Sequence, residues 1–389
     1  MFVALYFAAS PQAQEVSVGG QIRPRFEFRD PASGGYDTFT SMRVRAQVRA
    51  ALDRKVRVFI QLQDVRLWGE EANTLGDFRA DNFDLHQGYA ELGDIGGRPL
   101  SLRLGRQEIS LGGQRLVGAV GWTQQGRAFD GVRLSATPEG GRVDLLGIRL
   151  GDASASAVGI SQNAYLLGAY VQLTRIENAV VESYALYNRV SGGADTDQVT
   201  LGIRLAGSRP SLGYRIEGSY QAGTRGGKDV AAYLLGGRIG TQFAEGKAQL
   251  TFWFDHVSGD DAPGDGKIKV FDTLFTTNHK FYGYADLFLN LPAHTGGLGL
   301  QDFAIKAQVT PVSEFTLALD VHSFFLAKDG GLSSRRLAEE ADLTCTYRYS
   351  KQVSVVSGFS YVFTRDSLSR IGRLSEDLKF GYMLMNVAF

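Results

Sequence analysis

Apolar and polar residues alternate with a period of two over nearly the whole of this chain. Between Met42 and Leu52, the apolar side chains fall on one face of an extended chain and the arginines fall on the other. A helix would scatter both kinds around its circumference, whereas a strand separates them. The same alternation recurs in about eighteen segments. It predicts an all-β protein built from many amphipathic strands.

The predicted strands are joined by connections of two kinds. Short turns such as Asp53-Arg54 and Ser350-Lys351 alternate with connections that include long loops near residues 67–81, 110–124 and 259–297. This alternation is typical of a bacterial outer-membrane barrel, with both termini and the short turns in the periplasm. The strands are expected near residues 16–28, 39–52, 55–66, 82–92, 99–109, 125–137, 141–151, 163–176, 178–190, 196–207, 211–222, 229–243, 247–258, 298–310, 314–327, 337–349, 352–365 and 376–389.

The composition leaves one way for the chain to cross a bilayer. The hydrophobic content is 44%, yet no run of about 18 apolar residues occurs, and a chain without such a run can span lipid only as a closed barrel. A soluble sandwich or propeller is the alternative, but its outward face would be polar. Here the continuous face is apolar. We therefore predict a transmembrane antiparallel β-barrel of about 18 strands, with a lumen that is either a channel or a plugged pore.

The C-terminal segment fits the closing strand of such a barrel. Met383, Met385, Val387 and Phe389 share one face, and the chain ends on an aromatic residue. The alternative is a core strand of a soluble sandwich. We expect residues 378–389 to pair with the first strand near residues 16–28, so that no edge stays open in lipid. Phe389 would then lie at the periplasmic rim, where the barrel-assembly machinery could read it.

The first residues differ in character from the rest. An apolar run followed by small residues ends near Ala13 and Gln14, as in a signal peptide, although the usual basic start is missing. A disordered or strand-like terminus is the alternative. We assign residues 1–14 to the remnant of a signal peptide and residues 15–389 to a single outer-membrane β-barrel domain.

Basic residues gather on the polar faces of the predicted strands. A ladder of guanidinium groups favours anions in a narrow pore. Acidic residues on later strands, Asp255, Asp320, Glu340 and Asp342, make the net charge +0. The alternative is that the arginines only brace the wall by pairing with Glu91 and Glu217. Arg149 shares the predicted polar face, and the residues expected to line the pore and bind substrate are Arg23, Arg25, Arg43, Arg45, Arg49, Arg57, Arg103, Arg133, Arg204, Arg215 and Arg238.

Two stretches carry a resemblance to a known family. Residues 105–118 (GRQEISLGGQRLVG), followed by Trp122 and by residues 127–132 (RAFDGV), resemble the signature of the alginate export family of outer-membrane channels. The loop with residues 271–275 (FDTLF) and 279–286 (HKFYGYAD) is similar to that family as well. The resemblance implies an eighteen-stranded barrel that passes an anionic polysaccharide through an arginine-rich lumen, gated by loops and by a periplasmic turn. The periplasmic turns here are all short, which departs from that inner gate.

The stretch over residues 105–132 also has a physical interpretation of its own. The paired glycines at 112 and 113 permit a sharp reversal at the outer end of a strand. We expect a loop fixed across the mouth of the barrel, with Asp130 turned outward above the bilayer. Its predicted members are Arg106, Arg115 and Arg127, which would bind Glu108 and Asp130, together with Trp122.

The leading hypothesis is a passive export or diffusion channel for anionic, alginate-like saccharides; the alternative is a general or small-anion uptake porin. An enzyme would need a nucleophile with a base, or paired carboxylates, and the five His form no such group. An adhesive barrel would not need charged lumen walls. No cofactor is expected except for Ca²⁺ at Asp260, Asp261 and Asp265, where the EF-hand pattern lacks its final Glu. The expected partners are the lipid bilayer, lipopolysaccharide, an anionic polysaccharide and periplasmic export proteins, but not nucleic acid.

Overall fold

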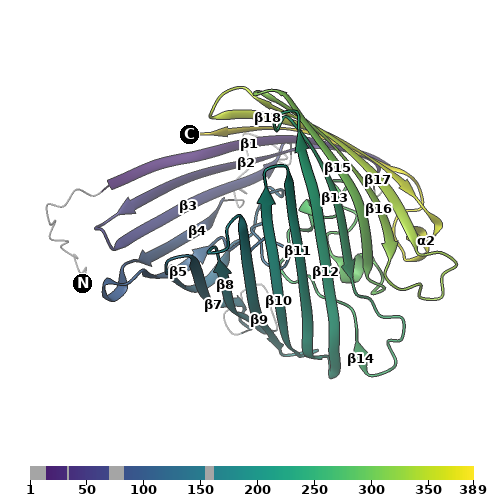
Figure 1. Ribbon diagram of the computed structural model, residues 1–389, viewed down its shortest axis with the longest axis horizontal. Helices are drawn as coiled ribbons and strands as arrows, with labels where there is room; N and C mark the ends of the chain where they lie inside the picture. The colour runs from purple at the N-terminus through teal and green to yellow at the C-terminus, as the bar shows by residue number, and fades with distance from the viewer. Residues whose placement is uncertain (1–14, 33–34, 70–82, 154–161) are drawn as a thin grey trace.

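The chain forms one antiparallel sheet that curves round and closes on itself in the computed structural model (Figure 1). The structure describes residues 15–32, 35–69, 83–153 and 162–389. The predicted signal peptide and most of the loop near residues 67–81 lie outside these ranges. Among the described residues, no helix is both long and apolar enough to span a membrane.

The expected strands are all present in the described residues. Their ends differ from the predicted ends by a few residues, as is usual for element boundaries. The long strands are β1 (Glu15–Ala32), β2 (Gly35–Ala51), β3 (Val56–Leu67), β4 (Phe83–Leu92), β5 (Leu100–Gln107), β6 (Phe129–Ala136), β7 (Gly141–Gly151), β8 (Asn163–Leu173), β9 (Ala179–Ser191), β10 (Thr196–Arg209), β11 (Leu212–Arg225), β12 (Lys228–Phe243), β13 (Ala248–Val257), β15 (Leu300–Val312), β16 (Phe315–Leu326), β17 (Arg336–Arg348), β18 (Val353–Thr364) and β19 (Leu378–Ala388). The short elements are β14 (Lys267–Ile268), η1 (Ile95–Gly97), η2 (Asn278–Lys280), α1 (Leu291–His294) and α2 (Asp366–Arg370).

The barrel closes where the sequence predicted. β1 pairs antiparallel with β19 from Gln21 opposite Ala388 to Asp30 opposite Lys379. The last residue continues the ladder, because Phe389 N donates to Gly20 O at 3.1 Å and Gly20 N donates to Phe389 O at 2.8 Å. Each of the other long strands pairs with its neighbours along the chain. The eighteen long strands therefore form a closed barrel, which satisfies the backbone groups that lipid could not.

The two faces of the sheet have the chemistry expected of a barrel in lipid. Leu201, Ile203 and Ile216 point outward and are 54%, 58% and 56% exposed. Their strand neighbours Thr200 and Glu217 point inward and are buried. A surface of this kind is stable only against the apolar interior of a membrane.

One arginine departs from its predicted face. Arg149 of β7 lies opposite Asp130 of β6, in a register that also sets Val132 against Gly147 and Leu134 against Leu145. Leu145 is 49% exposed on the outer face, so Arg149 points outward too. It pairs with Asp152 at 2.9 Å. The prediction that Arg149 continues the polar inner face was therefore wrong, because its parity follows Leu145.

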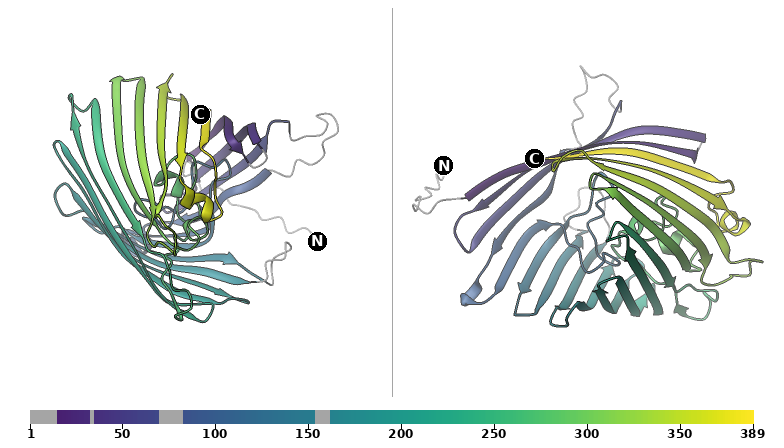
Figure 2. Two further views of the ribbon diagram at one scale, coloured as in Figure 1. Left: turned by 90° about the vertical axis from the view of Figure 1, so that its right-hand side faces the viewer. Right: turned by 45° about the horizontal axis from the view of Figure 1, so that its top comes forward.

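Two long connections fold into the barrel instead of standing above it (Figure 2). We call residues 108–128, between β5 and β6, the first inner loop, and residues 258–299, between β13 and β15, the second inner loop. Both contribute to a buried apolar cluster with inward-facing strand residues; Ile109, Val117, Phe271, Phe281 and Phe324 are all fully buried in it. Part of the lumen is therefore filled by packed side chains.

Candidate functional site

The first inner loop is held against the wall by arginines that donate to its backbone carbonyls. Arg23 of β1 donates to Gly121 O at 2.7 Å and to Thr123 O at 2.8 Å. Arg25 donates to Trp122 O at 2.5 Å, and Arg43 of β2 donates to Gln124 O at 3.2 Å. Arg25 also pairs with Glu27 at 2.7 Å. Peptide carbonyls carry no net charge, so Arg23 and Arg43 remain cationic groups committed to holding the loop.

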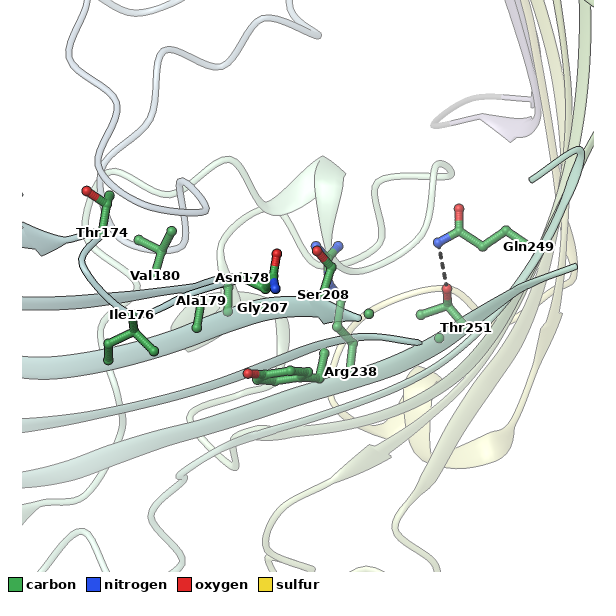
Figure 3. Close-up of a pocket in the computed structure, with 14 residues that line it drawn as sticks. Thr174, Ile176, Asn178, Ala179, Val180, Gly207, Ser208, Arg238, Gln249 and Thr251 are labelled. Carbon is green, nitrogen blue, oxygen red and sulfur yellow. Dashed lines mark hydrogen bonds between the residues drawn. The ribbon is translucent and has the colours of Figure 1, made fainter. Parts of the chain in front are cut away.

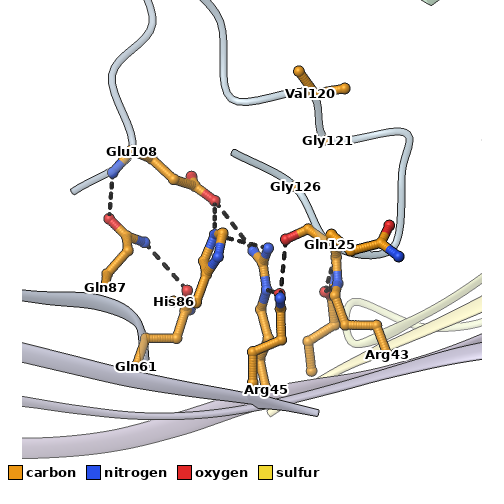
Figure 4. Close-up of polar contacts among 12 residues, drawn as sticks. Arg43, Arg45, Gln61, His86, Gln87, Glu108, Val120, Gly121, Gln125 and Gly126 are labelled. Atoms are coloured by element: carbon orange, nitrogen blue, oxygen red, sulfur yellow. Dashed lines mark hydrogen bonds and ion pairs between the residues drawn. The ribbon is translucent and has the colours of Figure 1, made fainter. Parts of the chain in front are cut away.

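A polar cluster anchors the start of the same loop to β2 and β4 (Figure 4). Glu108 Oε1 lies 2.7 Å from His86 Nε2 and 3.2 Å from Arg45 Nη1. Burial raises the pKa of Glu108, but the hydrogen bond with His86 and the charge of Arg45 outweigh it and lower the pKa overall. Glu108 is therefore ionised at neutral pH and neutralises one arginine of the wall.

Arg115 of the first inner loop joins that loop to the second inner loop and to the wall of the barrel. Its guanidinium group lies 2.6 Å and 2.9 Å from the two carboxylate oxygens of Asp255 on β13, and Nη1 donates to Tyr282 Oη at 3.0 Å. The side chain is 1% exposed and stacks over Phe281 at 3.9 Å. Burial lowers the pKa of Arg115, but Asp255, Tyr282 and Glu217 raise it overall. Arg115 thus forms a buried, charged link between both inner loops and the barrel.

The acidic wall anchors the second inner loop directly. Ala285 N donates to Glu340 Oε1 at 2.7 Å, and Tyr284 N donates to Asp342 Oδ2 at 3.3 Å. Asp320 pairs with Lys306 at 2.6 Å on the same wall. The acidic residues predicted on the polar face do point inward. They are buried, and they bind backbone amides of the loop or a lysine of the wall.

The two inner loops also bind one another. Gly118 N donates to Phe275 O at 2.9 Å and Phe275 N donates to Leu116 O at 2.8 Å. Arg127 donates to the carbonyls of Phe275 and Thr276. These bonds make the two loops one body inside the lumen.

An aromatic contact reinforces that body. Trp122 stacks on His279 with ring centroids 3.9 Å apart, and its Nε1 donates to Asp286 Oδ2 at 3.1 Å. Arg25 lies 4.2 Å from the Trp122 ring centroid. His279 and Asp286 are hydrogen-bonded at 2.7 Å, which places them in the packing of the loop.

The predicted mouth contacts are only partly found. Arg106 does bind Asp130, at 2.8 Å, and the pair faces outward. Arg115 and Arg127 bind the partners described above instead of Glu108 and Asp130. This part of the prediction was wrong, because the loop turns inward after Gln107 and carries both arginines toward β13 and the second inner loop. Gly112, at φ +51°, supports the predicted reversal.

The residues predicted to line the pore all lie on the inner face of the barrel, but they differ in what binds them. Arg103, Arg133 and Arg204 pair with Glu91, Asp144 and Glu182 of the wall. Arg49, Arg215 and Arg238 have no carboxylate partner among the described residues. Arg57 reaches Glu91 only at 3.6 Å and its side chain is 67% exposed. Arg49, Arg57, Arg215 and Arg238 all lie near the ends of their strands that are joined by short turns.

Some groups in this arrangement leave little trace in the sequence. Gln124 accepts from Arg23 Nε and donates to Ser41 Oγ, and His86 joins Arg45 to Glu108. Both residues are common polar types without a motif. Only the inward parity of His86 on β4 could have placed it in the lumen.

The stretch predicted for Ca²⁺ is occupied by lysines and backbone amides. Asp265 pairs with Lys269 at 2.6 Å and Asp261 pairs with Lys328 at 3.5 Å. Asp260 accepts from the amides of Ala262 and Lys269. Within the described ranges, no three His, Cys, Asp or Glu side chains are gathered around a point that a metal ion could occupy.

Comparisons with known proteins agree with this architecture. The family model described as alginate export matches residues 14–363, while no curated protein matches the sequence. OccK11 (OpdR) of Pseudomonas aeruginosa is similar in structure, with a TM-score of 0.67, 12% identity and 96% of each chain covered. OpdO of the same organism has a TM-score of 0.67 at 11% identity, covering 96% of this chain and 97% of its own.

A BenF-like porin from Pseudomonas fluorescens Pf-5 has a TM-score of 0.65 at 10% identity, covering 96% of this chain and 98% of its own. At these identities the likeness concerns the fold, which is that of outer-membrane porins. The family and the fold are those of transport channels and not of enzymes. The chain therefore belongs to the alginate export family and is an outer-membrane β-barrel channel.

Proposed function

We propose that this channel passes anionic saccharides, alginate-like uronates among them, by passive diffusion through its lumen. The observation that supports the proposal is the set of guanidinium groups on the inner wall that no carboxylate of the described residues neutralises. They include Arg49, Arg215 and Arg238, with Arg57 at 3.6 Å from a shared carboxylate. Arg23 and Arg43 also lack a carboxylate partner among the described residues, but they hold the first inner loop. In a narrow lumen such charges concentrate anions, and the planar guanidinium group matches a carboxylate.

A hollow on the basic wall gives these charges a setting that suits a sugar. It lies on the lumen side of β1 to β5, at the strand ends joined by short turns, and has a volume of about 280 Å³. Its lining includes Arg49, Arg57, Phe59, Tyr89 and Arg103. Arg49 lies over the Phe59 ring at 5.1 Å and Arg103 over Tyr89 at 4.2 Å. Arg103 is paired with Glu91, which also lines the hollow, whereas Arg49 has no carboxylate partner among the described residues. The aromatic faces therefore offer a surface for the ring of a saccharide, and Arg49 offers one for its carboxylate.

A second candidate function is the uptake of small anions. The observation that favours it is the body formed by the two inner loops, which fills part of the lumen with a packed apolar cluster. A polymer needs a continuous path past that body, whereas a small carboxylate needs only a gap. Both candidates share the basic wall and differ in the length of solute that passes.

Zero-current potentials across planar bilayers with a KCl gradient test the proposal. We expect anion preference for the wild type, and a large loss of that preference when Arg49, Arg57 and Arg238 are all replaced by Gln. Arg149→Gln is the matched control, because it removes the same charge from the outer face. Cation preference in the wild type, or an unchanged potential in the triple variant, would contradict the proposal. Block by uronate oligomers of increasing length then separates the two candidates.

A further inference from the structure

The lumen wall between β8 and β13 contains a second hollow, at the end of the barrel that carries the short turns (Figure 3). Its volume is about 570 Å³, which lies within the range of small-molecule sites. Its polar lining comes from Asn178, Ser208, Arg238, Gln249 and Thr251. None of the residues predicted from the sequence to bind substrate, apart from Arg238, lies in this hollow.

Small residues in register create the space. Ser208 lies opposite Gly213, Gly213 opposite Gly240, and Gly240 opposite Thr251. A Cβ atom at position 240 would lie 2.6 Å from Thr251 Oγ1, whereas one at position 213 would meet nothing within 4 Å. There is therefore free space above Gly213, and through it the hollow opens into the lumen.

The next row of the wall carries positive charge without a counterion. Arg215 and Arg238 lie directly opposite each other on β11 and β12. Arg215 is 2% exposed, and its Nε and Nη2 have no hydrogen-bond partner among the described residues. Arg238 has no carboxylate partner there either, and contacts the Trp253 ring at 5.7 Å.

The second inner loop adds another cation beside this pair. Lys280 donates to Gly113 O at 3.3 Å. Burial lowers the pKa of Lys280, and the charges of Arg215, Arg238 and Arg204 lower it further. Like charges held together in this way bind an anion favourably, because the anion relieves their mutual repulsion.

We propose that the hollow is a binding subsite for one carboxylated sugar unit, with its carboxylate at Arg238 and its hydroxyl groups at Asn178, Gln249 and Thr251. The inference rests on the proposed function and specifies where one unit of the substrate binds. The side-chain amides and the hydroxyl of the lining can each donate and accept, as sugar hydroxyls require. Among the described residues, Gln249 Nε2 bonds only Thr251 Oγ1, at a long 3.4 Å, so both groups can turn toward a ligand.

Channel block by D-glucuronate tests the subsite, with glucose and acetate as probes that lack the charge or the ring. In planar bilayers we expect glucuronate to interrupt the wild-type current at a lower concentration than either of them. Arg238→Gln should raise the half-blocking concentration by about tenfold, because it removes the charged partner of the carboxylate. Arg149→Gln, on the outer face, is its control.

A second variant tests the space and not the charge. Gly213→Phe should fill the hollow and raise the half-blocking concentration of glucuronate. Gly218→Phe is the matched control, because Gly218 follows Ile216 on the outer face of the same strand.

The outcomes separate the subsite from the proposed function. An anion-selective wild type whose block is unaffected by Gly213→Phe would overturn the subsite and leave the proposed function standing. Equal block by glucose or acetate would overturn it as well. A wild type that prefers cations would overturn the proposed function, and the subsite with it.

Discussion

At the scale of the residue, the arginines of the lumen divide by what neutralises or binds them. The sequence placed them correctly on the inner face through strand parity, but parity cannot show partners that come from distant loops. Arg23 and Arg43 bind carbonyls about 80 to 100 positions away along the chain, and backbone carbonyls carry no sequence signal. Arg49 and Arg238 stay without a carboxylate partner among the described residues, and the proposed function depends on them.

The buried pair of Arg115 and Asp255 gives a residue-scale prediction. Asp255→Asn should leave a fully buried guanidinium group with only Glu217, 3.9 Å away, as a carboxylate partner, at a cost of about 3–5 kcal/mol. We expect either lower barrel stability in urea or displacement of the inner loops with raised conductance.

The control for that variant is Asp130→Asn, at an exposed pair with Arg106. Such pairs contribute only about 0.2–1 kcal/mol. Equal effects of the two variants on stability and conductance would contradict the role assigned to Arg115.

At the scale of the element, the strands were predictable and the inner loops were not. The alternation gave every long strand, because lipid on one side and polar groups on the other impose a period of two. β6 begins at Phe129, four residues after its predicted start, since residues 125–128 still belong to the first inner loop. The inward course of that loop depends on tertiary contacts such as Trp122 on His279, which no local pattern specifies.

Removal of one inner loop provides the element-scale prediction. Replacing residues 264–297 by a short Gly-Ser linker should preserve the barrel, because β13 and β15 pair over Ala248–Val257 with residues outside the deletion. The single-channel conductance should rise several-fold, since the buried body of Phe271, Phe281 and Tyr282 leaves the lumen. A folded, heat-modifiable barrel with unchanged conductance would show that the loop does not restrict the pore.

At the scale of the whole molecule, closure and the lipid-facing belt determine stability. The terminal strand, predicted from its apolar face and final aromatic residue, does pair with β1. Its outward residue Met383 lies midway along β19 and is 56% exposed. These features were predictable because a barrel edge left open in lipid would leave backbone groups unsatisfied.

A charged side chain on the lipid-facing surface should destabilise the barrel more, the deeper it lies in the bilayer. Met383→Arg should destabilise the barrel in lipid vesicles by about 2–4 kcal/mol, whereas Val16→Arg near the strand end should cost about 0–1 kcal/mol. Equilibrium unfolding in urea, followed by tryptophan fluorescence, measures both. Costs that are equal at the two positions would mean that the assumed membrane placement is wrong.

The central claim is that the lumen conducts carboxylated saccharides. Efflux from proteoliposomes tests it most directly, with a uronate trisaccharide and a neutral glucose trisaccharide trapped together in the same vesicles. The basic inner wall predicts faster loss of the uronate, and a loss of that advantage when Arg49, Arg57 and Arg238 are replaced by Gln. Equal efflux of the two trisaccharides, or faster efflux of the neutral one, would contradict the claim.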